Sequence, residues 1–99
     1  MNIAIDYDDT YTLDKKLWNK IIYMFVDAGH NVFCVTKRYK ELADDIRADM
    51  GVPIIYATKS KLEAVANLNL KIDVWIDDKP QSIIPYKART PLNKGFRKW

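Results

Sequence analysis

The sequence predicts an α/β fold: a three-layer Rossmann-like sandwich with a parallel sheet of four to five strands. Short segments that are apolar throughout alternate with longer segments in which apolar residues recur at helical spacing. Strands without polar alternation are typical of parallel sheets, and right-handed crossovers between them place helices on both faces. With 99 residues, the chain is expected to form a single domain, 1–99.

The apolar segments expected to be strands are 2–6, 31–36, 53–57 and 72–76, with a short fifth strand within 81–87. The segments expected to be helices are 15–29, 39–51 and 61–70. Asp14 is expected to be the N-cap of the first helix, and Gly29 its stop signal. In the third helix, the side chains expected to face inward are Leu62, Val65, Ala66 and Leu68.

Composition narrows the class of protein. Hydrophobic residues make up 48% of the chain and charged residues 29%, which is typical of a folded globular domain. No apolar run reaches the roughly 18 residues that a membrane span needs, and the first residues have no signal-peptide layout. We therefore expect a cytoplasmic protein with no membrane partner. The single cysteine, Cys34, lies in an apolar run and is expected to be a buried structural thiol.

Charge is unevenly distributed along the chain. All 13 acidic residues precede residue 79, whereas six of the 16 Lys and Arg residues lie within 79–99. The segment 86–99 is therefore a basic C-terminal segment, and it also contains Phe96 and Trp99. Cations with aromatic residues between them are one pattern of nucleic-acid contacts, so nucleic acid is a candidate partner through this segment.

Polar side chains follow each expected strand, where ligands bind in an open parallel sheet. Carboxylates follow the first and fourth strands, Thr36 and Arg38 follow the second, and Lys59 and Lys61 follow the third. If the first and fourth strands are neighbours, the two acidic clusters meet, and their mutual repulsion favours protonation or a bound cation. Ligands that are all oxygen favour a hard ion, of which Mg²⁺ is the first choice.

Four ordered motifs resemble those of the haloacid dehalogenase (HAD) superfamily, whose members are mostly Mg²⁺-dependent phosphatases. They are "DYDDT", "VFCVT", a lysine ahead of a helix, and "VWIDD", and they span residues 2 to about 80. The resemblance implies that Asp6 is the nucleophile, Asp8 the general acid and base, and Thr36 a phosphate ligand. It also implies that Mg²⁺ is held by Asp6, Asp8 (through its carbonyl), Asp77 and Asp78, without deciding which of the last two binds it directly.

Two cationic residues of the expected site leave alternatives open. Either Lys59 or Lys61 is the catalytic and phosphate-binding lysine, and we prefer Lys61 because it directly precedes the apolar helix. Arg38 follows the phosphate-binding threonine by two residues, an arrangement that also occurs in polynucleotide 3'-phosphatases and related phage-type proteins. That resemblance implies a second phosphate ligand, and the alternative is a solvated charge.

The function predicted from these features is that of a Mg²⁺-dependent phosphomonoester hydrolase acting through an aspartyl-phosphate intermediate. Most HAD enzymes carry a cap that closes over the site, but the short connections of this chain leave no room for one. We therefore expect an open site that accepts a nucleotide-like or nucleic-acid phosphate, or another phosphorylated small molecule. The alternative is a HAD-like module that binds a phosphorylated ligand or a protein partner without turning it over. The oligomeric state is left open.

Overall fold

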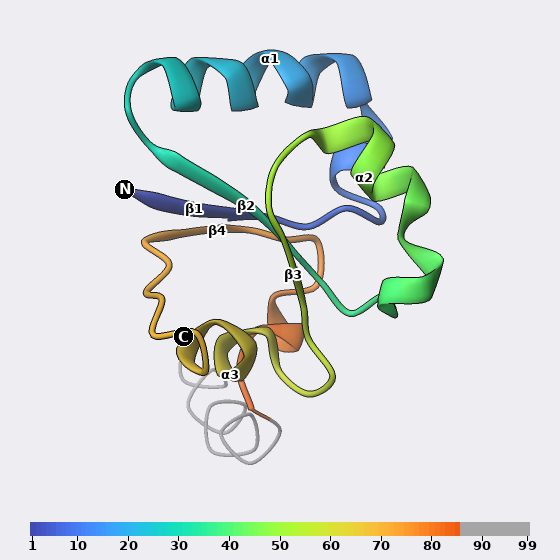
Figure 1. Cartoon of the computed structure of the whole chain (residues 1–99), viewed down its shortest axis with the longest axis vertical. Helices are drawn as coiled ribbons and strands as arrows, with labels where there is room; N and C mark the ends of the chain where they lie inside the picture. The colour runs from blue at the N-terminus through green and yellow to red at the C-terminus, as the bar shows by residue number, and fades with distance from the viewer. Residues whose placement is uncertain (86–99) are drawn as a thin grey trace, which may run out of the picture.

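The four strands form one all-parallel sheet in the order β3-β2-β1-β4. Their bounds are β1 (Asn2–Ile5), β2 (Asn31–Thr36), β3 (Ile54–Tyr56) and β4 (Val74–Ile76). This computed structural model describes residues 1–85, and the predicted basic segment 86–99 lies outside them (Figure 1). All four strands expected from the sequence are present, and β4 lies beside β1, as the meeting of the two acidic clusters requires.

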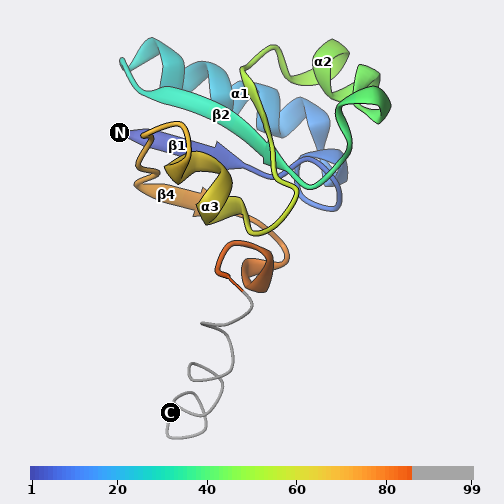
Figure 2. The same ribbon diagram turned by 60° about the horizontal axis from the view of Figure 1, so that its bottom comes forward.

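Helices lie on both sides of this sheet. The α-helices are α1 (Lys15–Asp27), α2 (Asp44–Met50) and α3 (Lys61–Ala66), and the short 3₁₀ helices are η1 (Tyr11–Leu13), η2 (Lys40–Leu42) and η3 (Pro80–Ser82). Figures 1 and 2 show α1 and α2 over one face of the strands and α3 over the other. The described chain is thus an α/β unit with the alternation of elements that the sequence predicts.

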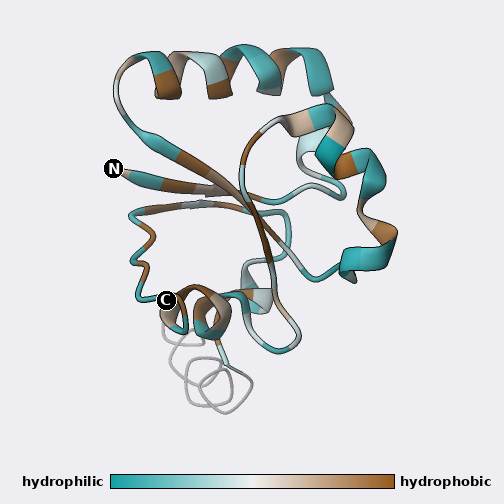
Figure 3. Ribbon diagram, in the orientation of Figure 1, coloured by the Kyte–Doolittle hydropathy of each residue, from teal (hydrophilic) through white to brown (hydrophobic). Residues whose placement is uncertain are grey.

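Two buried clusters occupy the two faces of the sheet, because successive side chains of a strand point in opposite directions. Ile3 and Ile5 pack in the cluster that also contains Ile22 of α1 and Ile46 of α2. Ala4, between them, belongs to the cluster beneath α3. In Figure 3 the strands carry the hydrophobic colour in the middle of the fold, between hydrophilic loops. This double burial explains why β1 is apolar from Ile3 to Ile5.

The first helix begins as the sequence predicts. The Asp14 carboxylate accepts a hydrogen bond from the backbone N–H of Leu17 at 3.1 Å, which satisfies one of the N–H groups left free at a helix N-terminus. The helix ends at Asp27, and Gly29 adopts a φ of +90°, which glycine tolerates without strain.

The second helix is shorter than predicted, because the expected helix 39–51 is divided into η2 and α2. The carbonyl of Leu42 accepts from the Arg38 guanidinium at 2.7 Å, and the N–H of Ile46 donates to the Asp45 side chain at 2.9 Å. Both groups would otherwise pair with each other in a continuous helix. The α-helix therefore begins only at Asp44, and Leu42, the last residue of η2, is exposed.

The third helix is also shorter and is turned differently from the prediction. It ends at Ala66, and Asn69 with φ +54° stops the chain from continuing it. Lys61 and Val65, four residues apart, face the fold interior and are buried. With about 100° between successive helical residues, this orientation turns Leu62 and Ala66 outward, and both are exposed. Leu68 lies beyond the end of the helix and is also exposed.

Through residue 85, no fifth strand follows β4, and residues 86 and 87 of the expected strand lie outside the described part of the chain. The chain instead forms η3, and the carbonyl of Ile83 accepts from the N–H of Leu62 at 2.8 Å. The connections that precede α1 and α3 are short, at residues 6–14 and 57–60. Among residues 1–85, no helix combines the length and apolarity needed to cross a membrane.

Candidate functional site

A polar cleft opens at the carboxyl ends of the strands, where a parallel sheet places its ligands. It has a volume of about 310 Å³, and its walls comprise five aspartates, three lysines, Arg38, Thr36 and Ser82. The residues predicted for the site all lie in this cleft: Asp6, Asp8, Thr36, Arg38, Lys61, Asp77 and Asp78. The fold thus brings together side chains that are separated by up to 72 positions in the sequence.

Lys61 forms the centre of the cleft floor. Its ammonium donates to Asp6 Oδ1 at 2.8 Å and to Asp77 Oδ2 at 2.6 Å, and its side chain is only 3% exposed. The side chains of Asp6 and Asp77 are 10% and 3% exposed, so the three charges share a buried setting. A lysine is rarely buried unless opposite charges compensate it, and here two carboxylates do so.

The position of Lys61 follows from the start of α3. Ser60 caps this helix by accepting from the N–H of Glu63 at 3.1 Å, which makes Lys61 the first helical residue. From this position its ammonium reaches Asp6, the residue that directly follows β1. Lys59 is exposed and lines a different groove, between β3 and α3. Of the two lysines left open by the sequence, the structure places Lys61 against the aspartates.

Thr10 links the two acidic clusters, a contact that the sequence motifs do not predict. Its buried hydroxyl lies 3.3 Å from Asp6 Oδ2 and 3.3 Å from Asp78 Oδ1, and it accepts from the backbone N–H of Asp78 at 3.2 Å. Thr10 is the last residue of the "DYDDT" motif, so its spacing was the available signal. Ser82, whose hydroxyl lies 3.4 Å from Asp77 Oδ2, had no signal in the sequence.

Three carboxylates could hold a metal ion together. One oxygen each from Asp6, Asp77 and Asp78 lies within 4.8 Å of the other two. Asp77 already accepts from Lys61 and Ser82 through Oδ2 and from the N–H of Lys79 through Oδ1 at 2.9 Å. Asp78 is the exposed member and has fewer partners, so it is better placed to offer an oxygen to an ion. The set of donors is all oxygen, which suits a hard divalent cation.

Burial is the largest influence on the pKa values of Asp6 and Lys61. Desolvation raises the pKa of Asp6 to about 6, although the hydrogen bond and charge of Lys61 oppose the rise. For Lys61, burial lowers the pKa, but the two ion pairs outweigh it, and the pKa lies above its usual value. Lys61 therefore remains a cation at neutral pH, while Asp6 is a carboxylate that a further positive charge would stabilise.

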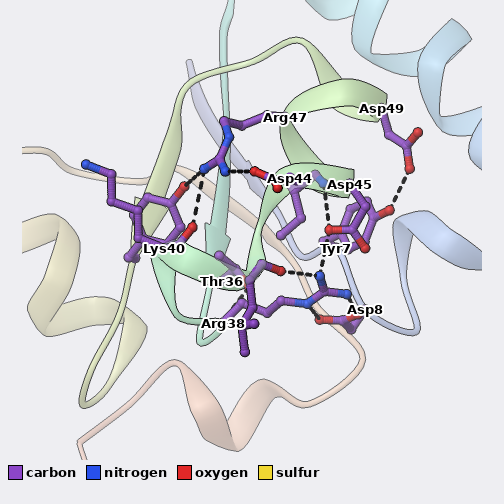
Figure 4. A network of polar contacts seen from close by, with 12 residues as sticks. Tyr7, Asp8, Thr36, Arg38, Lys40, Asp44, Asp45, Arg47 and Asp49 are labelled. Carbon is purple, nitrogen blue, oxygen red and sulfur yellow. Dashed lines mark hydrogen bonds and ion pairs between the residues drawn. The ribbon is translucent and has the colours of Figure 1, made fainter.

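Asp8 lies outside the acidic triad of Asp6, Asp77 and Asp78, and it faces Arg38. The strand β1 ends at Ile5 and a turn follows Asp6, and both Asp6 and Asp8 line the same cleft. Arg38 donates from Nε to Asp8 Oδ2 at 3.1 Å and from Nη2 to Asp8 Oδ1 at 2.8 Å. Figure 4 shows the guanidinium between Asp8 and Asp45 of α2. The Nε and Nη2 groups form the fork of Arg38, the pair of parallel N–H donors predicted to bind a phosphate. In this structure the carboxylate of Asp8 occupies that fork.

Thr36 ends β2 with its side chain in the cleft wall. It is 1% exposed, and its Oγ1 accepts from the backbone N–H of Arg38 at 3.1 Å. Because that bond uses the oxygen as an acceptor, the hydroxyl proton is available for donation to an anion in the cleft.

Comparisons of the chain with models of protein families, with curated proteins and with solved structures found no significant match.

Proposed function

We propose that the protein is a Mg²⁺-dependent phosphomonoester hydrolase that works through an aspartyl-phosphate intermediate. We also propose that its domain is HAD-like and capless, with the architecture of a three-layer Rossmann-like sandwich. One observation carries the proposal: Asp6 is held at the end of a central strand against buried Lys61, with Asp77 and Asp78 beside it. A nucleophilic carboxylate facing a phosphate needs fixed positive charge around it, because both are anions.

The residues present fit a divalent ion. The carboxylates of Asp6 and Asp78 have fewer hydrogen-bond partners than that of Asp77, and Asp6 and Asp77 together hold Lys61 in place. Around the cleft, five carboxylates face four cationic side chains, so a net negative charge remains before any ligand enters. Bound there, Mg²⁺ would offset the negative charge of the phosphate oxygens and of Asp6.

In the proposed reaction, an oxygen of Asp6 forms a bond to phosphorus while the ester bond to the leaving oxygen breaks. Asp8, carrying a proton, gives it to that oxygen. Asp8 then takes a proton from water, whose oxygen bonds to phosphorus as the bond to Asp6 breaks, releasing inorganic phosphate. Lys61 stabilises charge on the phosphate oxygens together with the hydroxyl of Thr36, which lines the same cleft.

An additional anionic group on the substrate would find partners in the cleft. Lys37 and Lys79 line it at the ends of β2 and β4, on either side of the β1 site. Within residues 1–85, neither ammonium has an ion-pair partner, although five carboxylates line the same cleft. Unpaired cations flanking an open site support a nucleotide-like or nucleic-acid phosphate as the substrate class.

Hydrolysis of 4-nitrophenyl phosphate and of a panel of nucleoside monophosphates tests the proposal. We expect turnover with Mg²⁺, none with a chelator, and a loss of at least about 100-fold in Asp6→Asn. Asp27→Asn, at the end of α1 outside the cleft, is the matched control and should keep the wild-type rate. Full activity of Asp6→Asn would refute the nucleophile, and no turnover on any substrate would refute the enzyme.

A binding module is the second candidate, and the Asp8–Arg38 pair is the observation that favours it. A carboxylate whose two oxygens both accept from a guanidinium is not free to move protons to and from a substrate. A protein that binds phosphate esters with Mg²⁺ but forms no product over hours would have this function.

A further inference from the structure

The Arg38 guanidinium is fixed from two opposite sides. On the side of α2, Nη1 donates to Asp45 Oδ1 at 2.6 Å and to the Leu42 carbonyl at 2.7 Å. On the side of the cleft, Nε and Nη2 donate to the two oxygens of Asp8. The guanidinium carbon also lies 5.3 Å from the centre of the Tyr7 ring. These contacts with Asp45, Leu42 and the Tyr7 ring do not involve Asp8, so they would still hold the guanidinium if Asp8 moved away (Figure 4).

The edge of Arg38 that holds Asp8 has the geometry for a phosphate. Two parallel N–H groups match a pair of carboxylate oxygens or a pair of phosphate oxygens equally well. Arg38 and Asp8 both line the cleft that contains Asp6 and Lys61. The side chain of Asp8 is 50% exposed and that of Arg38 27%, so an ion arriving from solvent can reach the pair.

We infer that Asp8 occupies the phosphate-binding fork of Arg38 as an internal competitor, and that an incoming phosphate displaces it. The inference rests on the proposed phosphatase function. It implies that Arg38 binds the phosphate, and Asp8 becomes free, only after the substrate has arrived. Partly exposed ion pairs contribute little stability, so the exchange of one anion for another on Arg38 carries a small free-energy cost. Displacement would free the Asp8 carboxylate at the moment when a phosphate lies beside Asp6. Asp45 is then a positioning residue, because it keeps the fork aimed at the cleft while its partner changes.

Binding of inorganic phosphate in the presence of Mg²⁺, measured by titration calorimetry, tests the exchange without any turnover. The informative pair of variants is Asp8→Asn and Asp9→Asn. Both residues line the cleft and both substitutions remove one negative charge, but only Asp8 is paired with Arg38. Asp9 has a φ of +61°, a conformation that asparagine also tolerates, so the control keeps the loop intact.

We expect Asp8→Asn to bind phosphate about fivefold more tightly than Asp9→Asn, the gain available from removing a partly exposed competing ion pair. In an Arg38→Gln background, the two Asn variants should agree within twofold. Arg38→Lys, which keeps the charge but lacks the fork, serves the same purpose if the glutamine variant is unstable.

Asp45→Asn and Asp44→Asn form a second matched pair, because Asp44 pairs with Arg47 instead of Arg38. We expect weaker phosphate binding in Asp45→Asn than in Asp44→Asn, by severalfold.

Equal affinities of Asp8→Asn and Asp9→Asn would overturn the inference. So would a gain in Asp8→Asn that persists without Arg38, or no phosphate binding by Asp8→Asn up to tens of millimolar. These results do not depend on whether the protein is a phosphatase, because calorimetry measures phosphate binding without turnover. A protein that hydrolyses 4-nitrophenyl phosphate while its two Asn variants bind phosphate equally keeps the function and loses the exchange.

Discussion

Replacing Lys61 by methionine is the sharpest perturbation of the site. The change removes the cation and keeps an unbranched side chain of similar length, so two buried carboxylates lose their shared partner. Asp6 is 10% and Asp77 3% exposed, which leaves little water to take over the role of Lys61. Breaking a buried ion pair by removing one partner typically costs about 3–5 kcal/mol. For a chain of this size we expect a loss of about 3 kcal/mol in unfolding free energy, or at least about 12 °C in Tm.

The penalty should depend on pH. Burial raises the pKa of Asp6 to about 6, above its usual value of 3.8, so the folded protein keeps this proton in a range where the unfolded chain has lost it. Stability in the absence of metal therefore falls as pH rises from about 4 to about 6. Removing Lys61 takes away the interactions that oppose the rise, so the window extends upward in the variant. Lys61→Met should be less destabilised at pH 5 than at pH 8.

The assay is urea unfolding with a chelator present, at both pH values, followed by circular dichroism. Lys59→Met is the matched control, because Lys59 is exposed and lies outside the cleft, and it should change stability by no more than about 0.5 kcal/mol. A Lys61→Met protein that loses less than about 1 kcal/mol at pH 8, or one whose loss is the same at pH 5, would refute the reasoning from burial.

Three further outcomes are expected. Burial raises the pKa of Cys34 to about 12, so an aromatic disulfide reagent at pH 8 should label it only after unfolding; rapid labelling of the folded protein would contradict its burial. Asp14→Ala removes the cap on the Leu17 N–H and should cost about 1 kcal/mol in urea unfolding, against no change if the cap were unimportant. Mg²⁺ at 100 times its Kd should stabilise the protein by about 2.7 kcal/mol in thermal unfolding. Asp78→Asn should lose most of this stabilisation and Asp27→Asn none, and a full Mg²⁺ effect in Asp78→Asn would exclude that carboxylate as a ligand.

The sequence predicted the elements that depend on burial pattern or on contacts within a few residues. Strand β1 was expected because its residues are apolar throughout, and both of its faces are covered by packed side chains. Helix α1 was expected from its spacing and from Asp14, whose cap depends only on residues within one turn. The convergence of the acidic clusters was expected from position alone, since parallel strands end at the same edge of a sheet.

Other features could not be predicted, because contacts distant in the sequence decide them. The face that α3 turns inward is set by Lys61, whose ion pairs with Asp6 and Asp77 outweigh the apolar character of Leu62. Apolar spacing within the helix carries no information about a carboxylate 55 positions earlier. The start of α2 was likewise missed, because it depends on where the Arg38 guanidinium finds its acceptors.

The sequence by itself determined the order of strands and helices along the chain, and it placed a set of charged and hydroxyl side chains at one edge of the sheet. Periodicity and capping act over a few residues, and that range suffices for those features. Only the tertiary structure decided which lysine reaches the aspartates, that Thr10 bridges Asp6 and Asp78, and that Asp8 lies on the fork of Arg38. Several polar and charged groups could pair in each case, and the distances and burial that select among them exist only once the chain has folded.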